Sequence, residues 1–221
     1  YGEGQRLVAE RETALQRLAL SESHGQFNAL ASGRFAFSFP DPYNTEPLAN
    51  LILAQAAAAW SGNERTNRSA NRRIALVGAA GIELASPFLR AGAERIDLLD
   101  PDPDLPQFLL DYLPEADRQA LGDPRVHLAR ADPRSFLARG GEPYGLVVLL
   151  LPEPATASLC RFYSLEFFRM LRSRLARDGV LAMRFSSSVN YFGDEMGGLA
   201  GPILALASTL AVEVPENATA H

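Results

Sequence analysis

Short runs of alternating apolar and polar residues characterise the first part of the chain. These runs cover residues 7–9, 15–20 and 27–39, and Ser32-Gly33 interrupts the last of them. Alternation with a period of two is typical of half-buried strands, and a Ser-Gly pair suits a tight hairpin turn. We therefore predict an antiparallel β unit of three or four strands, which we place at residues 1–43.

A helix and a linker are expected next, at residues 44–72. Residues 46–60 are apolar and alanine-rich, with Leu48, Leu51 and Ile52 at helical spacing, and residues 61–72 are polar. The linker holds several arginines, which could meet a phosphate or a lipid headgroup, but a solvated loop is the simpler interpretation.

From residue 73 the pattern changes to alternating strands and helices. Strands are predicted at 74–78, 96–100, 126–130, 146–151 and 180–185, and helices at 83–91, 106–113, 133–139 and 164–176. Strands rich in Val and Leu on both faces, alternating with amphipathic helices, indicate a parallel sheet covered on each side. We predict an α/β protein whose doubly wound, Rossmann-like unit spans residues 73–221, and we expect its C-terminal end to be incomplete. Such sheets bind ligands at the carboxyl ends of their strands.

Composition narrows the function classes. The net charge of -5 disfavours a nucleic-acid-binding surface, and the absence of lysine removes Schiff-base and P-loop chemistry. Three scattered histidines and one cysteine, Cys160, predict neither a metal site nor a disulfide, and a reducing, cytoplasmic setting is the simpler assumption. No apolar run approaches the roughly 20 residues of a membrane span.

The candidate chemistry lies at the ends of the predicted strands. A small-residue turn from Gly78 to Gly81 follows the first of them, and Asp100 ends the next strand about 20 residues on, where an acid can bind ribose hydroxyls. Together these two features favour a nucleoside pocket. Asp132 could bind an adenine amino group or simply cap a helix, and Glu153, held between two prolines, could bind an amine or do nothing.

The order of these features resembles the spermidine synthase family, the polyamine aminopropyltransferases, which have a methyltransferase-type nucleotide fold. The resemblance runs from about residue 8 to residue 210. Its motifs are Ala14-Leu15-Gln16-Arg17, residues 41–50, the turn at Gly78, Leu98-Leu99-Asp100-Pro101-Asp102-Pro103, residues 123–132, residues 162–168 and residues 175–180. The segment Leu151-Pro152-Glu153-Pro154 and Asn190-Tyr191 look most like the branch attached to a multi-spanning membrane region.

This resemblance implies transfer of an aminopropyl group from decarboxylated S-adenosylmethionine to a small polyamine-type amine, with release of methylthioadenosine. Carried over by position, Gln16 contacts the sulfonium nucleotide, Asp100 the ribose and Asp132 the adenine, while Glu153 holds the amine. The family's proton-accepting acid falls on Leu150, and Thr45 replaces its His or Gln. The nucleoside half of the pocket is thus kept while the amine half is mostly erased, which leaves Glu153 as the only nearby candidate for the base.

Three function classes stay open at this point. The first is the aminopropyltransferase, for which Glu153 is the candidate catalytic residue. The second is a non-catalytic module that binds a nucleoside, or nothing, and serves a membrane partner or a dimer. The third is an S-adenosylmethionine-dependent methyltransferase that uses the same Gly78 and Asp100. The resemblance also implies a homodimer on the cytoplasmic face of a membrane, while the composition leads us to expect neither a metal nor a nucleic-acid partner.

Overall fold

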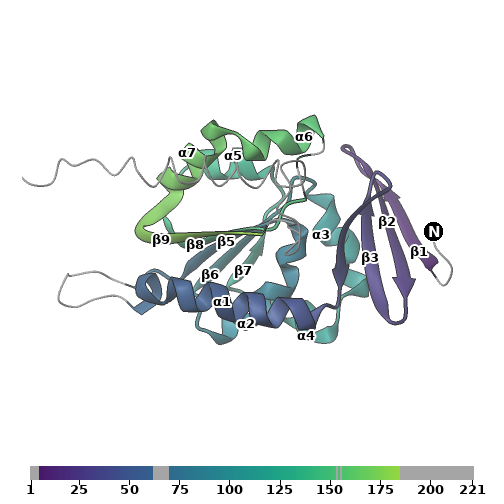
Figure 1. The fold of residues 1–221 in the computed structure, drawn as a ribbon, viewed down its shortest axis with the longest axis horizontal. Coiled ribbons are helices and arrows are strands. Elements are labelled where there is room, and N and C mark those ends of the chain that lie inside the picture. The colour runs from purple at the N-terminus through teal and green to yellow at the C-terminus, as the bar shows by residue number, and fades with distance from the viewer. Residues whose placement is uncertain (1–4, 62–69, 153, 155, 185–221) are drawn as a thin grey trace, which may run out of the picture.

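The computed structural model describes residues 5–61, 70–152, 154 and 156–184, and every structural statement below concerns these residues. They form two β-sheets and the helices that pack on them (Figure 1). None of the described helices is both long and apolar enough to cross a membrane.

The N-terminal sheet has four antiparallel strands in chain order: β1 (Arg6–Glu12), β2 (Arg17–Ser23), β3 (Gln26–Ala31) and β4 (Arg34–Phe39). The hairpin turn predicted at Ser32-Gly33 is confirmed, because both residues have positive φ angles, of 50° and 75°, between β3 and β4. A second turn of the same kind joins β2 to β3 at His24 and Gly25, with φ angles of 53° and 80°.

A parallel sheet of five strands forms the larger unit. Its strands are β5 (Arg73–Val77), β6 (Arg95–Leu99), β7 (Val126–Leu128), β8 (Tyr144–Leu149) and β9 (Leu175–Met183). They lie in the order β7-β6-β5-β8-β9, and each adjacent pair is parallel. The predicted α/β class with a parallel sheet and a small antiparallel β unit is therefore confirmed. The strand order reverses between β5 and β8, which is where such sheets place ligands.

Helices cover both faces of the parallel sheet (Figure 1). One face packs against α1 (Pro42–Ser61), α2 (Ala85–Arg90) and α4 (Glu115–Leu121), and the other against α5 (Pro133–Ala138) and α7 (Leu165–Arg174). The remaining helices are short: η2 (Ala79–Leu84), α3 (Asp104–Leu109), η3 (Leu110–Tyr112), α6 (Ala157–Cys160) and η4 (Arg161–Tyr163). Two hydrophobic cores result, one on each face.

The largest boundary error lies between the last helix and the last strand that the structure describes. The helix expected at 164–176 ends at Arg174, and β9 begins at Leu175 rather than at residue 180. The chain turns into a strand there because Leu175 pairs with Tyr144 of β8. Helix α4, with its largely polar sequence, was not predicted at all.

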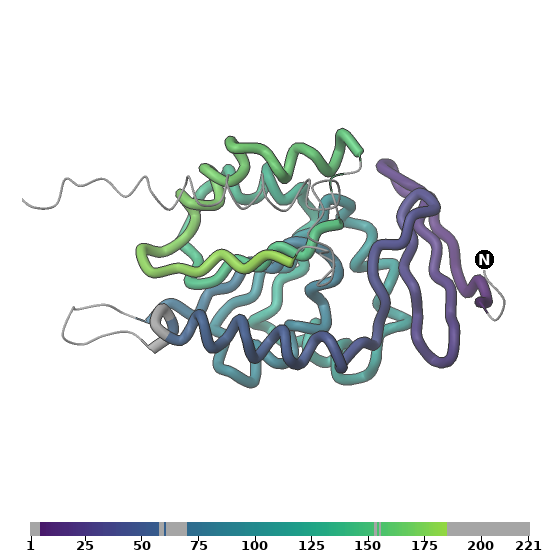
Figure 2. The backbone as a smooth tube through the Cα atoms, viewed as in Figure 1, coloured from purple at the N-terminus to yellow at the C-terminus, as the bar shows by residue number. Residues whose placement is uncertain are grey.

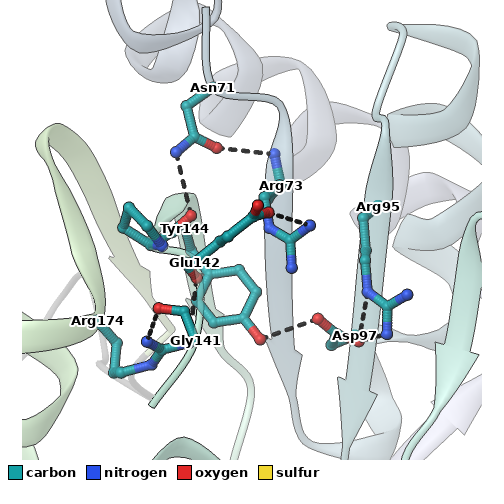
Figure 3. Close-up of polar contacts among 9 residues, drawn as sticks. Asn71, Arg73, Arg95, Asp97, Gly141, Glu142, Tyr144 and Arg174 are labelled. Atoms are coloured by element: carbon teal, nitrogen blue, oxygen red, sulfur yellow. Dashed lines mark hydrogen bonds and ion pairs between the residues drawn. The ribbon is translucent and has the colours of Figure 1, made fainter.

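A buried polar network ties the amino ends of the parallel strands together (Figure 3). Asp97 accepts hydrogen bonds from the Tyr144 hydroxyl at 2.9 Å and from the Arg95 guanidinium at 2.8 Å, and the His127 ring lies 3.1 Å from it. Burial and the Asp97 carboxylate raise the pKa of Tyr144 to about 12. Because Tyr144 opens β8, the network lies one strand length from the carboxyl edge and stabilises the sheet without reaching the site described next.

Candidate nucleoside-binding site

The turn after β5 admits only glycine at its first position. Gly78 has a φ of 113°, and a Cβ atom there would lie 2.4 Å from the carbonyl oxygen of Leu150. The Gly78 N-H donates to the Leu99 carbonyl oxygen at 2.7 Å, and the Gly81 N-H donates back to the Gly78 carbonyl oxygen at 2.9 Å. The turn is therefore pressed between the carboxyl ends of β6 and β8.

Asp100 follows β6 directly and turns its carboxylate toward this turn. Its Oδ2 accepts a hydrogen bond from the Ala79 N-H at 2.7 Å, and its Oδ1 accepts one from the Asp102 N-H at 2.8 Å. The residue is 6% exposed, and burial raises its pKa from an ordinary 3.8 to about 7 despite these two donors. Each carboxylate oxygen keeps a second lone pair for a ligand donor.

Asp102 joins the N-terminal sheet to the same edge. Its Oδ2 accepts hydrogen bonds from the Thr13 hydroxyl at 2.7 Å and from the Gln16 side-chain amide at 3.1 Å. These contacts bridge 89 and 86 residues of sequence, so only the folded chain brings them together. The sequence analysis named Asp102 only as part of the motif at residues 98–103 and assigned it no contact.

A cavity of about 640 Å³ opens between the two sheets, at the carboxyl edge of the parallel one. Figure 2 shows the N-terminal strands lying beside that edge. The residues that line the cavity and concern the chemistry include Gln16, Ala79, Asp100, Asp102, Leu150 and Arg161. A volume in this range suits a small organic ligand.

The predicted residues do not all meet in this cavity. Gln16 and Asp100 line it, whereas Gly78 and Gly81 hold the turn behind it. Asp132 caps α5 by accepting the Ser135 N-H at 3.1 Å, and its other oxygen forms an ion pair with Arg161 at 2.5 Å. Asp132 is not part of the cavity wall, so the expected convergence of Asp100 and Asp132 on one cavity is not met in this structure.

The cavity wall is apolar at Leu150, where the resemblance placed the family's acid. Leu150 lines the cavity at 6% exposure, and its N-H donates to the Val77 carbonyl oxygen at 2.8 Å. Glu153, the predicted base, lies outside the described residues. Among the described residues, no group of three or more His, Cys, Asp or Glu side chains is placed to hold a metal ion.

Three arginines line the cavity, and none was predicted to. Arg34 begins β4, Arg161 begins η4 and Arg184 follows β9. No motif marks them, because each reaches the cavity from a different element. Only the folded chain brings the three to one cavity.

The strand order, the glycine turn and the acid after β6 define a Rossmann-like protein of the methyltransferase type. No family model matches the chain. Curated relatives do: polyamine aminopropyltransferase 1 of Streptomyces coelicolor is 30% identical over 112 residues, which are 50% of this chain and 21% of that protein. The polyamine aminopropyltransferase of a Synechococcus species is 27% identical over 183 residues, which are 81% of this chain and 56% of that protein.

Solved structures agree with these relatives on the fold. A spermidine synthase in complex with the transition-state analogue AdoDATO superposes with a TM-score of 0.72 at 12% identity, covering 93% of this chain and 65% of that one. The spermidine synthase of Thermotoga maritima gives 0.71 at 13% identity, with 93% and 64% covered. The similarity to the spermidine synthase family is therefore confirmed. The chain spans between about a fifth and just over half of the length of the curated relatives it matches.

Proposed function

We propose that this chain is a spermidine-synthase-like aminopropyltransferase domain whose cavity binds the adenosyl group of decarboxylated S-adenosylmethionine. The observation that carries the proposal is the buried Asp100 carboxylate beside the Gly78 turn, at the cavity wall. Its two oxygens each accept one backbone N-H and can each accept one ribose hydroxyl. An acid kept buried at the cost of a raised pKa is more typical of a binding site than of packing.

The proposed reaction is a displacement at carbon. The amine nitrogen attacks the methylene carbon next to the sulfonium, a C-N bond forms, and the C-S bond breaks with its electron pair going to sulfur. Neutral methylthioadenosine leaves and the product nitrogen stays an ammonium group, because the one proton that is released goes from the substrate ammonium to a base before the attack. The amine must lose a proton from a group whose ordinary pKa is roughly 10, which is why an acidic side chain has to receive it.

Each remaining role is assigned by resemblance. Gln16 contacts the sulfonium nucleotide, since it already lies on the cavity wall bonded to Asp102. Glu153 is the proposed base and Asp132 the proposed adenine partner, which requires Arg161 to release its carboxylate or share it. Gly78 and Gly81 shape the turn that admits the nucleotide.

A non-catalytic nucleoside-binding module is the second candidate, and Leu150 favours it. This side chain lines the cavity where the family places its proton acceptor, and a hydrocarbon cannot accept a proton. Loss of a positioned base costs about two to four orders of magnitude in rate. Binding without turnover would then be the function.

Calorimetric titration with methylthioadenosine and with decarboxylated S-adenosylmethionine, followed by a turnover assay with putrescine, tests both candidates. Binding that Asp100→Asn weakens at least tenfold, while the exposed control Asp111→Asn does not, supports the nucleoside site. Turnover that Glu153→Gln abolishes selects the enzyme, and binding without product selects the module. No binding of either nucleoside would refute the proposal.

The family likeness also supports a homodimer, and the resemblance to the membrane-fused branch supports attachment to a membrane region. Light scattering on the purified chain measures the first: a mass of twice 24.0 kDa is expected, and a monomer at all concentrations contradicts it.

A further inference from the structure

The described wall of the cavity carries more positive than negative side chains. Three arginines, Arg34, Arg161 and Arg184, line it together with two acids, Asp100 and Asp102. A cavity that selects a polycation is expected to have the opposite balance, because like charges at close range repel. The composition of the wall therefore bears on the class of ligand.

The two acids are already engaged by the protein. Both oxygens of Asp100 accept backbone N-H groups, and Asp102 accepts hydrogen bonds from Thr13, Gln16 and the Asp104 N-H. Burial raises the pKa of Asp100 to about 7, so near neutral pH its charge is only partly present. With Asp100 assigned to the ribose and Asp102 held by Thr13, Gln16 and Asp104, neither of these two acids is left for a second ammonium group.

The arginines are differently placed. The Arg161 guanidinium is fixed over the Phe162 ring at 4.5 Å, with its Nε donating to the Ser158 carbonyl oxygen at 2.9 Å and its Nη2 paired with Asp132. Arg34 and Arg184 are exposed, and neither side chain has a hydrogen bond or ion pair with any residue that the structure describes. Two cations at the cavity wall are thus available to a ligand.

We propose that the half of the cavity beyond the nucleoside binds a carboxylate-bearing ligand, through Arg34 and Arg184, rather than a simple polyamine. The inference rests on the nucleoside site proposed above and names the class of the second group. Guanidinium groups form charge-assisted, often bidentate hydrogen bonds with carboxylates, and a carboxylate is the anionic group that S-adenosylmethionine and amino-acid acceptors carry. The carboxylate belongs either to intact S-adenosylmethionine or to an amino-acid acceptor.

Two matched ligand pairs that differ by one carboxylate test the proposal. The first pair is S-adenosylmethionine and decarboxylated S-adenosylmethionine, titrated into the 221-residue chain. The second is ornithine and putrescine, titrated into the chain saturated with methylthioadenosine. We expect the carboxylate member of one pair to bind at least tenfold more tightly than its partner. A preference within the first pair assigns the carboxylate to the donor, and one within the second assigns it to the acceptor.

Variants at the arginines test the cause. Arg34→Gln and Arg184→Gln should reduce the preference toward one, while leaving methylthioadenosine affinity within about twofold. Arg139→Gln is the matched control, because Arg139 is exposed at the end of α5 and does not line the cavity. Unchanged methylthioadenosine affinity also shows that each variant is folded.

The remaining outcomes separate the two proposals. Binding of methylthioadenosine with no preference in either pair, or with preference for the decarboxylated members, overturns the carboxylate site and leaves the nucleoside site standing. A preference that survives both arginine substitutions also overturns it. Failure to bind methylthioadenosine at all overturns the proposed function and this inference with it.

Discussion

Replacing Asp100 by asparagine tests whether burial of this acid makes the free energy of unfolding depend on pH. The Asp100 pKa rises from an ordinary 3.8 to about 7, mainly because the carboxylate is buried. A difference of about 3 units corresponds to about 4 kcal/mol. Between these two values the folded protein holds a proton that the unfolded chain has lost, so the free energy of unfolding falls as pH rises through this window and levels off above pH 7.

Asparagine removes that pH dependence and adds a constant cost. Its amide presents one acceptor instead of two, so either the Ala79 or the Asp102 N-H loses its partner, at about 1–3 kcal/mol. From pH 5 to pH 8 the wild type should therefore lose about 3 kcal/mol relative to Asp100→Asn. Contributions from other buried acids, such as Glu83 and Asp117, are common to both proteins and cancel.

Urea unfolding at pH 5 and pH 8, for the wild type, Asp100→Asn and the exposed control Asp111→Asn, measures this difference. The control should follow the wild type at both pH values. If the stability difference between the wild type and Asp100→Asn is the same at pH 5 and pH 8, to within roughly 0.5 kcal/mol, Asp100 ionises as an ordinary surface acid. That result would refute the claim that burial raises the pKa of the carboxylate in the proposed site.

Three further predictions concern the turn, the amine wall and the buried network. Gly78→Ala forces a Cβ against the Leu150 carbonyl oxygen and should lower the free energy of unfolding, measured in urea, by about 2–5 kcal/mol. The control Gly25→Ala, which has open space around it, should lower it by about 1 kcal/mol. Equal losses for the two variants would contradict the close approach at Gly78. Leu150→Asp should raise aminopropyl transfer to putrescine by about two orders of magnitude, and no gain in a product assay argues that the missing acid does not limit the rate. Tyr144→Phe leaves one Asp97 oxygen buried without its hydroxyl donor and should lower the free energy of unfolding by about 1–3 kcal/mol. A loss below roughly 0.5 kcal/mol in thermal or urea unfolding would show that the fold does not depend on this hydrogen bond.

The fold could be predicted where local sequence decides it. The Ser32-Gly33 turn follows from the need for positive φ angles, and the parallel sheet follows from strands that are apolar on both faces. Helix α4 could not be predicted in this way, because its two buried residues are Ala120 and the acid Asp117, which do not form an apolar stripe. The start of β9 depends on pairing with Tyr144, a tertiary contact that could not be predicted from the sequence of residues 175–179.

In the candidate site, too, the residues that could be predicted are those marked by local sequence. Gly78 and Asp100 were predicted because they lie at a fixed spacing on neighbouring strands, which is a local signal. Asp102 and Arg34 were missed as cavity residues, because the N-terminal sheet contacts the parallel sheet only through side chains far apart in sequence. Asp132 has the right residue type at the right strand end, but the ion pair with Arg161 occupies it, and no sequence pattern indicates that partner.

Leu150 and the three arginines of the described cavity wall both bear on which ligand the cavity takes. Replacement of an acid by Leu150 alone would leave a weaker polyamine site, since the remaining charges would still favour a cation. Three arginines oppose two acids on the described wall, and this balance weakens the binding of a dication whether or not a base is present. Leu150 also packs well: its Cδ1 lies 3.7 Å from the place where a Cβ on Gly81 would sit, so it fills the space beside the turn. We therefore expect the arginines, rather than Leu150 alone, to decide which ligand the cavity takes, and the matched ligand pairs described above measure this.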